Sequence, residues 1–155
     1  SKSINTKKIN NSIKNIFYFY NQILKKKINV KILGLNPHSG IDFSNNTEEK
    51  KIIEPTVTKL RRKFKKVEGP ISPDTAFIND KINNTCFLGM YHDQVLTVFK
   101  NLFKFEAANI TIGLKYLRLS PDHGTGKNLI KSRINNINNT SFLYCLKFCE
   151  KYIKS

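Results

Sequence analysis

The chain has 155 residues, with 27 Lys and Arg against 11 Asp and Glu, so its formal net charge is +16. No apolar run approaches the roughly 20 residues of a membrane-spanning helix, and residues 1–5 lack the apolar core of a signal peptide. The length suits one domain of ordinary size. We therefore expect a cytoplasmic chain without a membrane partner.

The basic balance could favour polyanions, but its make-up argues against specific nucleic-acid recognition. Every basic residue except Arg61, Arg62, Arg118 and Arg133 is Lys, and Asn and Ile are abundant throughout. Proteins that recognise specific base sequences depend on Arg for bidentate contacts with the bases. We interpret the excess of Lys as part of a general bias in composition, with the charges spread over solvated faces. We do not expect nucleic acid as a partner.

The three cysteines are Cys86, Cys145 and Cys149, and they form no Cys-x-x-Cys pair. Cys145 and Cys149 are one helical turn apart in an apolar stretch. We expect free thiols that pack in the core of a protein in a reducing compartment, and no structural zinc site.

The first half of the chain predicts a helix, a strand and a second helix. Apolar residues recur with helical spacing over residues 6–27, and Asn5 or Thr6 could cap this helix. A buried strand follows at 30–35 and a polar loop at 36–46. Thr47 caps the second helix, in which Pro55 either starts the helix proper or kinks it.

In the second half, the two prolines of residues 67–77 predict an extended segment and a loop rather than a regular element. The further elements are strands at 86–90, 108–113 and 116–120, and helices at 95–103, near 127–131 and at 140–153.

Strands separated by helices predict an α/β fold, with a mostly parallel or mixed sheet and helices on both faces. The close spacing of the strands at 108–113 and 116–120 predicts a local antiparallel or mixed part. There is no internal repeat, so we expect residues 1–155 to form a single α/β unit.

Two histidines, His38 and His92, come just after apolar strands, and the third is His123. Ligands collect at the carboxyl ends of strands in open α/β sheets, and imidazole is a common metal ligand. The sequence therefore offers a divalent-metal site at His38 and His92, with Asp93 and Asp74 as neighbours. The alternative is that each histidine only hydrogen-bonds within its loop.

Lys100, Arg118 and Lys127 could bind a phosphate or a carboxylate. Arg118 lies in an apolar strand, where a buried charge needs an anionic partner, either a ligand or an internal salt bridge. Residues 124–127 lack the spacing of a phosphate-binding loop, and no Gly-x-Gly-x-x-Gly fingerprint supports a Rossmann-type NAD site.

Five motifs occur together and in order: GLNPHSG at 34–40, PDTAF at 73–77, MYHDQ at 90–94, NITIGL at 109–114 and DHGT at 122–125. With them the chain resembles the C-terminal half of the 4-hydroxythreonine-4-phosphate dehydrogenase family, which serves pyridoxal phosphate biosynthesis. The resemblance covers essentially the whole chain and implies an isocitrate/isopropylmalate-dehydrogenase-like fold.

The resemblance implies an NAD-dependent oxidation of 4-phosphooxy-L-threonine to a β-keto acid, which decarboxylates to 3-amino-2-oxopropyl phosphate. It implies a divalent metal (Zn, Mg or Co) bound by three histidines, two of which match His38 and His92, while the third belongs to the N-terminal half. By the same matching, Lys100, Asn109 and Arg118 bind the phosphorylated substrate. The family is homodimeric and shares its active site between subunits. Asp93 or Asp74 could orient a ligand or transfer a proton.

The chain departs from the family pattern in its loops. Residues 41–46 replace a Gly-rich stretch, and Val95 and Thr97 stand where Gly and Pro are usual. The N-terminal half is absent, so the isolated chain could be inactive. Two alternatives stay open: a dehydrogenase of another phosphorylated hydroxy acid, and a non-catalytic, basic, polyanion-binding remnant.

Overall fold

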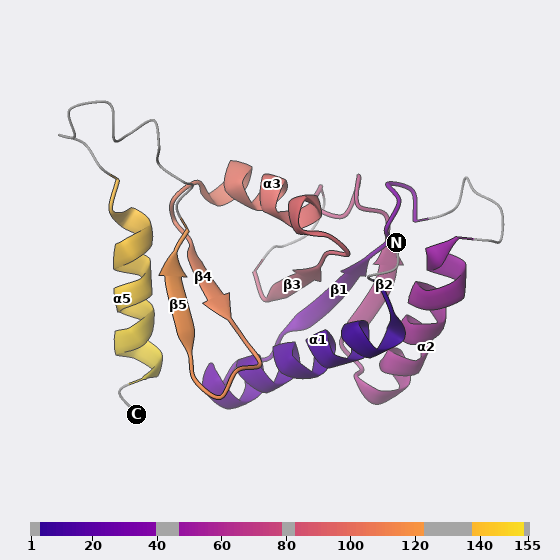
Figure 1. Cartoon of the computed structure of the whole chain (residues 1–155), viewed down its shortest axis with the longest axis horizontal. Coiled ribbons are helices and arrows are strands. Elements are labelled where there is room, and N and C mark those ends of the chain that lie inside the picture. The colour runs from indigo at the N-terminus through magenta and orange to yellow at the C-terminus, as the bar shows by residue number, and fades with distance from the viewer. Residues whose placement is uncertain (1–3, 40–46, 79–82, 123–137, 154–155) are drawn as a thin grey trace. The chain divides into compact units, whose positions relative to one another are not determined.

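A computed structural model describes residues 4–39, 47–78, 83–122 and 138–153 (Figure 1). The chain forms two compact units, residues 1–98 and 99–155. The boundary falls inside helix α3 (His92–Phe103), which begins three residues before the predicted helix at 95–103.

The first unit contains a parallel sheet in the strand order β2-β1-β3. The central strand β1 (Asn29–Leu33) pairs with β2 (Val67–Ile71) and with β3 (Thr85–Leu88), and both pairings are parallel. Because all three strands run the same way, their carboxyl ends lie at one edge of the sheet. The predicted parallel α/β sheet is confirmed.

Two helical segments of the first unit each contain a π-helical turn. Helix α1 (Thr6–Tyr18) continues into η1 (Phe19–Ile23), and Asn5 caps it by accepting a hydrogen bond from the backbone N–H of Lys8. The second segment begins with η2 (Glu49–Ile53) and continues as α2 (Glu54–Lys63). Pro55 lies in the first turn of α2, so it starts the regular helix, as one of the two alternatives proposed.

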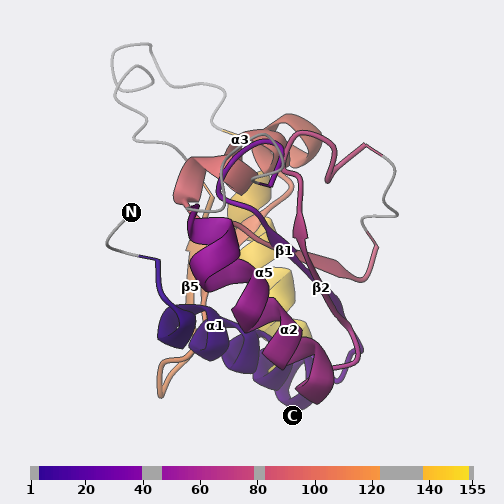
Figure 2. The same cartoon turned by 90° about the vertical axis from the view of Figure 1, so that its right-hand side faces the viewer.

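Helices α1 and α2 lie side by side on the same face of the sheet (Figures 1 and 2). The hydroxyls of Thr6 and Thr56 are 3.0 Å apart, and the Phe17 and Phe64 rings stack with centroids 4.8 Å apart. Burial of the apolar faces of these helices against β1 makes the core and supplies most of its stabilisation. Its fully buried apolar residues are Ile13, Val30, Ile32, Leu33, Ile53, Val57 and Val67.

Strand β2 corrects one sequence prediction. The two prolines of residues 67–77 predicted an extended segment and a loop rather than a regular element, but Val67–Ile71, which contains the first of them, pairs with β1 in the sheet. The prediction failed because β2 is an edge strand, where a proline that cannot donate a ladder hydrogen bond is tolerated. The Gly69–Pro70 peptide bond within it is cis.

The second unit contains an antiparallel pair of strands, β4 (Ala108–Thr111) and β5 (Arg118–Pro121), as their close spacing predicted. Helix α5 (Thr140–Tyr152) packs on this pair. Ser141 and Cys145 form the buried side of α5, whereas four of its large apolar side chains are exposed: Phe142, Leu143, Tyr144 and Leu146. The helix predicted near 127–131 lies outside the described residues.

The three cysteines are free thiols, as expected. Burial raises the pKa of the Cys86 thiol to about 11, so this group stays protonated near neutral pH and is a poor nucleophile. Among the helices that the structure describes, none combines the length and the apolar character needed to cross a membrane.

Gly34 provides a test of the packing at the carboxyl end of β1. A Cβ atom at this position would lie 2.5 Å from Oγ and 2.9 Å from Cα of Ser39, so the backbone would have to move. We expect Gly34→Ala to lower the free energy of unfolding by about 1–3 kcal/mol in urea denaturation. The control Gly89→Ala, whose Cβ would keep 3.2 Å from its nearest neighbours, should cost less. Equal losses in the two variants would contradict this account.

Candidate functional site

Four of the seven predicted site residues follow the carboxyl edge of the parallel sheet, in its loops and at the start of α3. The first histidine loop (residues 34–39) follows β1, residues 72–78 follow β2, and the second histidine loop (residues 89–92) follows β3. The Gly34 N–H donates a 2.9 Å hydrogen bond to the Ile71 carbonyl, and this bond connects the first two loops where they leave their strands. The strand directions therefore place both histidines and both aspartates after the same edge.

His38 lies beside Asp74, with 3.5 Å between Nε2 and Oδ2. Both side chains are about half exposed, so the ion pair alone adds little stability. The predicted neighbours His38 and Asp74 are thus brought together from two different loops. Ser39, which follows with a positive φ of 52°, is buried, and its hydroxyl has no hydrogen-bond partner in the described part of the chain.

A buried carboxylate holds the first histidine loop in place. Glu49, which is fully buried, accepts hydrogen bonds from the Asn36 backbone N–H (2.7 Å) and from its side-chain amide (3.0 and 3.1 Å). A buried acceptor with several donors is a strong restraint on a loop, because its loss would leave polar groups unpaired. Asn36 therefore positions the backbone immediately before Pro37 and His38.

His92 is the first residue of α3, and its Nδ1 lies 2.8 Å from Oδ1 of Asp93. Both side chains are about four-fifths exposed, so this contact is a weak one at the surface. Each histidine therefore contacts its own carboxylate: His38 contacts that of Asp74, and His92 contacts that of Asp93.

Gln94, in the first turn of α3, contacts both histidine loops. Its Nε2 donates to the Gly34 carbonyl and its Oε1 accepts from the Met90 N–H, both at 2.7 Å. The residue is 9% exposed.

The donor chemistry fits a divalent metal in part. A carboxylate that engages one ring nitrogen of a histidine orients the ring and leaves the other nitrogen as the metal-binding atom, and His38 and His92 each have such a carboxylate. Within the described residues, however, no group of three His, Cys, Asp or Glu side chains could hold a metal. Two imidazoles from this chain would need further ligands from elsewhere.

The second unit contains the predicted anion-binding residues. The Lys100 ammonium lies 2.7 Å from the Asp122 carboxylate and 2.7 Å from the Asp122 carbonyl oxygen. Asp122 is itself held in place, because its N–H donates to the Ser141 hydroxyl, which in turn donates to the Ala107 carbonyl. The anion that Lys100 contacts in this structure is therefore Asp122.

Arg118 differs from the sequence prediction. We expected a buried guanidinium, but Arg118 is exposed at the start of β5 and donates a 3.2 Å hydrogen bond to the Thr111 hydroxyl. The expectation was wrong because the strand pair leaves this residue uncovered, so the charge carries no burial cost. Asn109 on β4 is likewise exposed. His123 and Lys127 lie outside the described residues.

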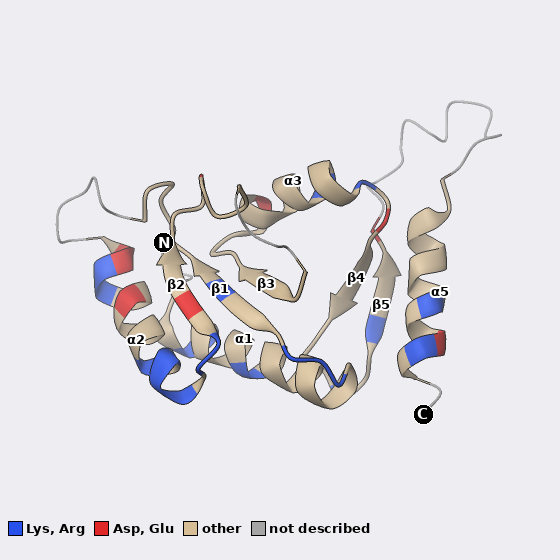
Figure 3. Cartoon of the chain, turned by 180° about the vertical axis from the view of Figure 1, so that it is seen from behind, with Lys and Arg blue, Asp and Glu red and all other residues tan. Residues whose placement is uncertain are grey.

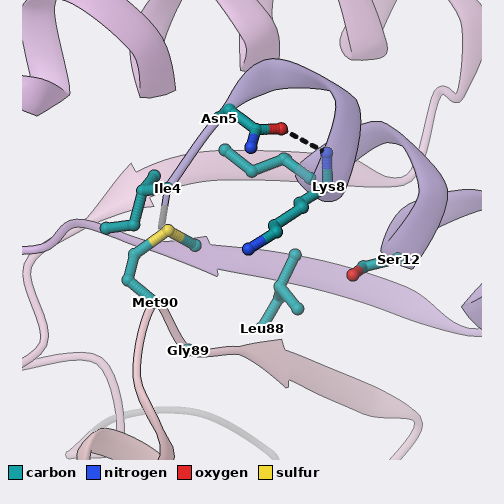
Figure 4. Close-up of a pocket in the computed structure, with 8 residues that line it drawn as sticks. Ile4, Asn5, Lys8, Ser12, Leu88, Gly89 and Met90 are labelled. Atoms are coloured by element: carbon teal, nitrogen blue, oxygen red, sulfur yellow. Dashed lines mark hydrogen bonds between the residues drawn. The ribbon is translucent and has the colours of Figure 1, made fainter. Parts of the chain in front are cut away.

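A pocket of about 220 Å³ lies in the first unit, between the start of α1 and the end of β3 (Figure 4). It contains none of the predicted site residues, although Gly89 and Met90 of the second histidine loop line one side of it. Its other lining residues are Ile4, Asn5, Lys8, Ile9, Ser12 and Leu88.

Most of the basic residues that the structure describes in the first unit are exposed, and Figure 3 shows where they lie along the chain. Three exposed lysines, 25–27, precede β1, and three exposed basic residues, 61–63, end α2. Cations in the last turn of a helix complement its dipole, which accounts for the α2 group without a polyanion partner.

Comparisons with known proteins identify the class of this fold. The structure matches that of 4-hydroxythreonine-4-phosphate dehydrogenase from Klebsiella pneumoniae with a TM-score of 0.74 and 28% identity, over 95% of this chain and 44% of the other. The fold is therefore the isocitrate-dehydrogenase-like α/β fold of this class of dehydrogenases.

The sequence comparisons then give the family. The model of the family described as pyridoxal phosphate biosynthetic protein PdxA matches residues 1–149. A 4-hydroxythreonine-4-phosphate dehydrogenase of Hydrogenobaculum is 38% identical over 98% of this chain, and one of Aquifex aeolicus is 42% identical over 78%. The chain belongs to the PdxA family. It spans about half the length of these relatives, 46% and 37% respectively.

Three residues that the sequence analysis did not select are central to this geometry: Glu49, Gln94 and Asp122. Glu49 looked like a first-turn helix residue, and its burial depends on a loop that folds back 13 positions along the chain. Gln94 and Asp122 lie inside the quoted motifs MYHDQ and DHGT, so the signal was present. Their roles depend on contacts that spacing alone does not give.

Glu49→Gln tests the restraint on the first histidine loop. The amide would turn an N–H group toward the donors of Asn36, and we expect the free energy of unfolding to fall by about 1–3 kcal/mol in urea denaturation. Glu68→Gln, at an exposed position on β2, is the control and should be nearly neutral. An unchanged midpoint for Glu49→Gln would show that the carboxylate is not a structural acceptor.

Lys100→Met tests the ion pair in the second unit. The Asp122 side chain is only 17% exposed, so loss of its cation should destabilise the fold by about 1–3 kcal/mol. Lys115→Met removes an exposed lysine from the same unit and should stay within about 0.5 kcal/mol of the parent. Thermal unfolding of both variants measures the difference, and equal behaviour would rule out a stabilising pair.

Proposed function

We propose that this chain is the C-terminal half of an NAD- and divalent-metal-dependent 4-hydroxythreonine-4-phosphate dehydrogenase. The reaction oxidises 4-phosphooxy-L-threonine to a β-keto acid, which decarboxylates to 3-amino-2-oxopropyl phosphate. Family membership supports the role in pyridoxal phosphate biosynthesis. The observation that carries the site is the arrangement of His38 and His92, each beside its own carboxylate, after neighbouring parallel strands.

His38 and His92 are the residues that would hold the metal, which would be Zn, Mg or Co. A bound divalent ion supplies Lewis acidity, which makes a substrate hydroxyl easier to deprotonate, and NAD accepts the hydride. Asp74 and Asp93 keep the two imidazoles oriented through their contacts at 3.5 and 2.8 Å. The same carboxylates could take up a proton from the substrate or from water.

Lys100, Asn109 and Arg118 would bind the phosphate and polar groups of the substrate. The exposure of Asn109 and Arg118 on the β4–β5 pair leaves both side chains accessible to a ligand. The Lys100 ammonium lies between a carboxylate and a carbonyl oxygen, so a phosphate would have to share it with Asp122 or displace the carboxylate.

A complete site needs ligands that this chain does not supply among its described residues. We propose that they come from the N-terminal half and from a second subunit, in a cytoplasmic homodimer with a shared active site. The share of the relatives' length that this chain covers supports this proposal, because about half of each relative is unmatched.

Metal binding by the two histidines can be tested on the chain itself. At a hundredfold excess over its dissociation constant, a ligand that binds only the folded state stabilises it by about 2.7 kcal/mol. We expect zinc to raise the melting temperature, and His38→Ala and His92→Ala each to reduce the shift. Asn11→Ala, at an exposed position on α1, should keep it. A full zinc shift in the double histidine variant would contradict the proposed site.

A further inference from the structure

We infer that Gln94 is a positioning residue, whose side-chain amide fixes the two histidine loops relative to each other. The inference deepens the proposed function, because it names the group that sets the spacing of the two proposed metal-binding loops. Gln94 itself holds no metal or substrate in this proposal. It acts through the backbone of residues 34 and 90.

The two hydrogen bonds of Gln94 continue the pairing of β1 and β3 beyond the end of the strand ladder. The register of these strands ends at Ile32 opposite Leu88. Gly34 and Met90 each lie two residues further along, at the next equivalent position. Gln94 donates to the Gly34 carbonyl and accepts from the Met90 N–H, so its amide connects this pair in place of a direct backbone bond.

The primary amide of Gln94 suits both partners, because it carries a donor and an acceptor. The Gly34 carbonyl requires a donor and the Met90 N–H requires an acceptor, which also fixes the orientation of the amide. The side chain is 9% exposed, and a buried hydrogen bond is costly to leave unmade. Gly89 leaves room for the Gln94 amide, because a Cβ at residue 89 would lie only 3.3 Å from Oε1 of Gln94.

The connection matters for function because each histidine belongs to a loop whose backbone Gln94 binds. The His38–Asp74 and His92–Asp93 pairs are both substantially exposed. The backbone of each loop carries its histidine ring, and Gln94 joins those two backbones. A substitution of Gln94 should therefore disturb the backbone of both loops.

Two variants separate the two hydrogen bonds. Gln94→Glu keeps an acceptor for Met90 but places a carboxylate against the Gly34 carbonyl, whereas Gln94→Met loses both bonds. Gln22→Glu is the matched control for the change in charge, because Gln22 is exposed. Ile13→Val, on the buried face of α1, controls for a general loss of stability.

Amide hydrogen exchange of the 155-residue chain is the first measurement, and it needs no metal. We expect Gln94→Met to speed exchange at Gly34, Asn36 and Met90 by about tenfold relative to Val30. Gln94→Glu should affect Gly34 and Asn36 more than Met90. Faster exchange at Met90 alone, or the same pattern in Ile13→Val, would overturn the inference.

Zinc affinity, measured by calorimetry with zinc chloride alone, is the second measurement. If the parent chain binds zinc, both Gln94 variants should bind it about tenfold more weakly, and Gln22→Glu and Ile13→Val should bind it as the parent does. Unchanged affinity in the Gln94 variants would overturn the positioning role. Failure of the parent to bind zinc would count against the proposed metal site, while the exchange experiment would still decide the role of Gln94.

Discussion

The parallel pairing of β1 with both β2 and β3 is the constraint on which the first unit depends. It buries β1 completely at Val30, Ile32 and Leu33, and it points three carboxyl ends toward one edge. Loops that come from distant parts of the sequence therefore begin side by side. The contact of His38 with Asp74, from the loops after β1 and β2, follows from this arrangement.

The groups that would do chemistry and the groups that hold them differ in burial. The histidines and their aspartates are accessible, whereas Glu49 and Gln94 are buried and bind backbone atoms of the same loops. The second unit repeats the pattern, because buried Ser141 fixes the Asp122 backbone while Lys100 stays partly exposed. Buried polar groups with satisfied hydrogen bonds make such loops rigid without occupying the reactive side chains.

The sequence predicted what depends on local pattern. Apolar periodicity located α1 and β1, and the placement of His38 and His92 after strands needed no three-dimensional information. Features that depend on tertiary contacts were missed: the strand at Val67–Ile71, whose proline is acceptable only at a sheet edge, and the exposure of Arg118, which depends on what covers β5. The partner of Lys100 was missed for the same reason, since Asp122 lies 22 residues away in sequence.

The strand order also has a consequence for how the chain acquires its structure. Strand β1 precedes both of its partners, and its register pairs Val30 with Val67 and Cys86. During synthesis the most buried strand of the sheet therefore leaves the ribosome with two open edges, which stay unsatisfied until much of the remaining first unit has emerged. Contacts that distant in sequence slow folding, and unpaired edges invite association with other chains. Helix α1 is complete before β1 appears, so it can pack against the nascent strand before β2 and β3 emerge.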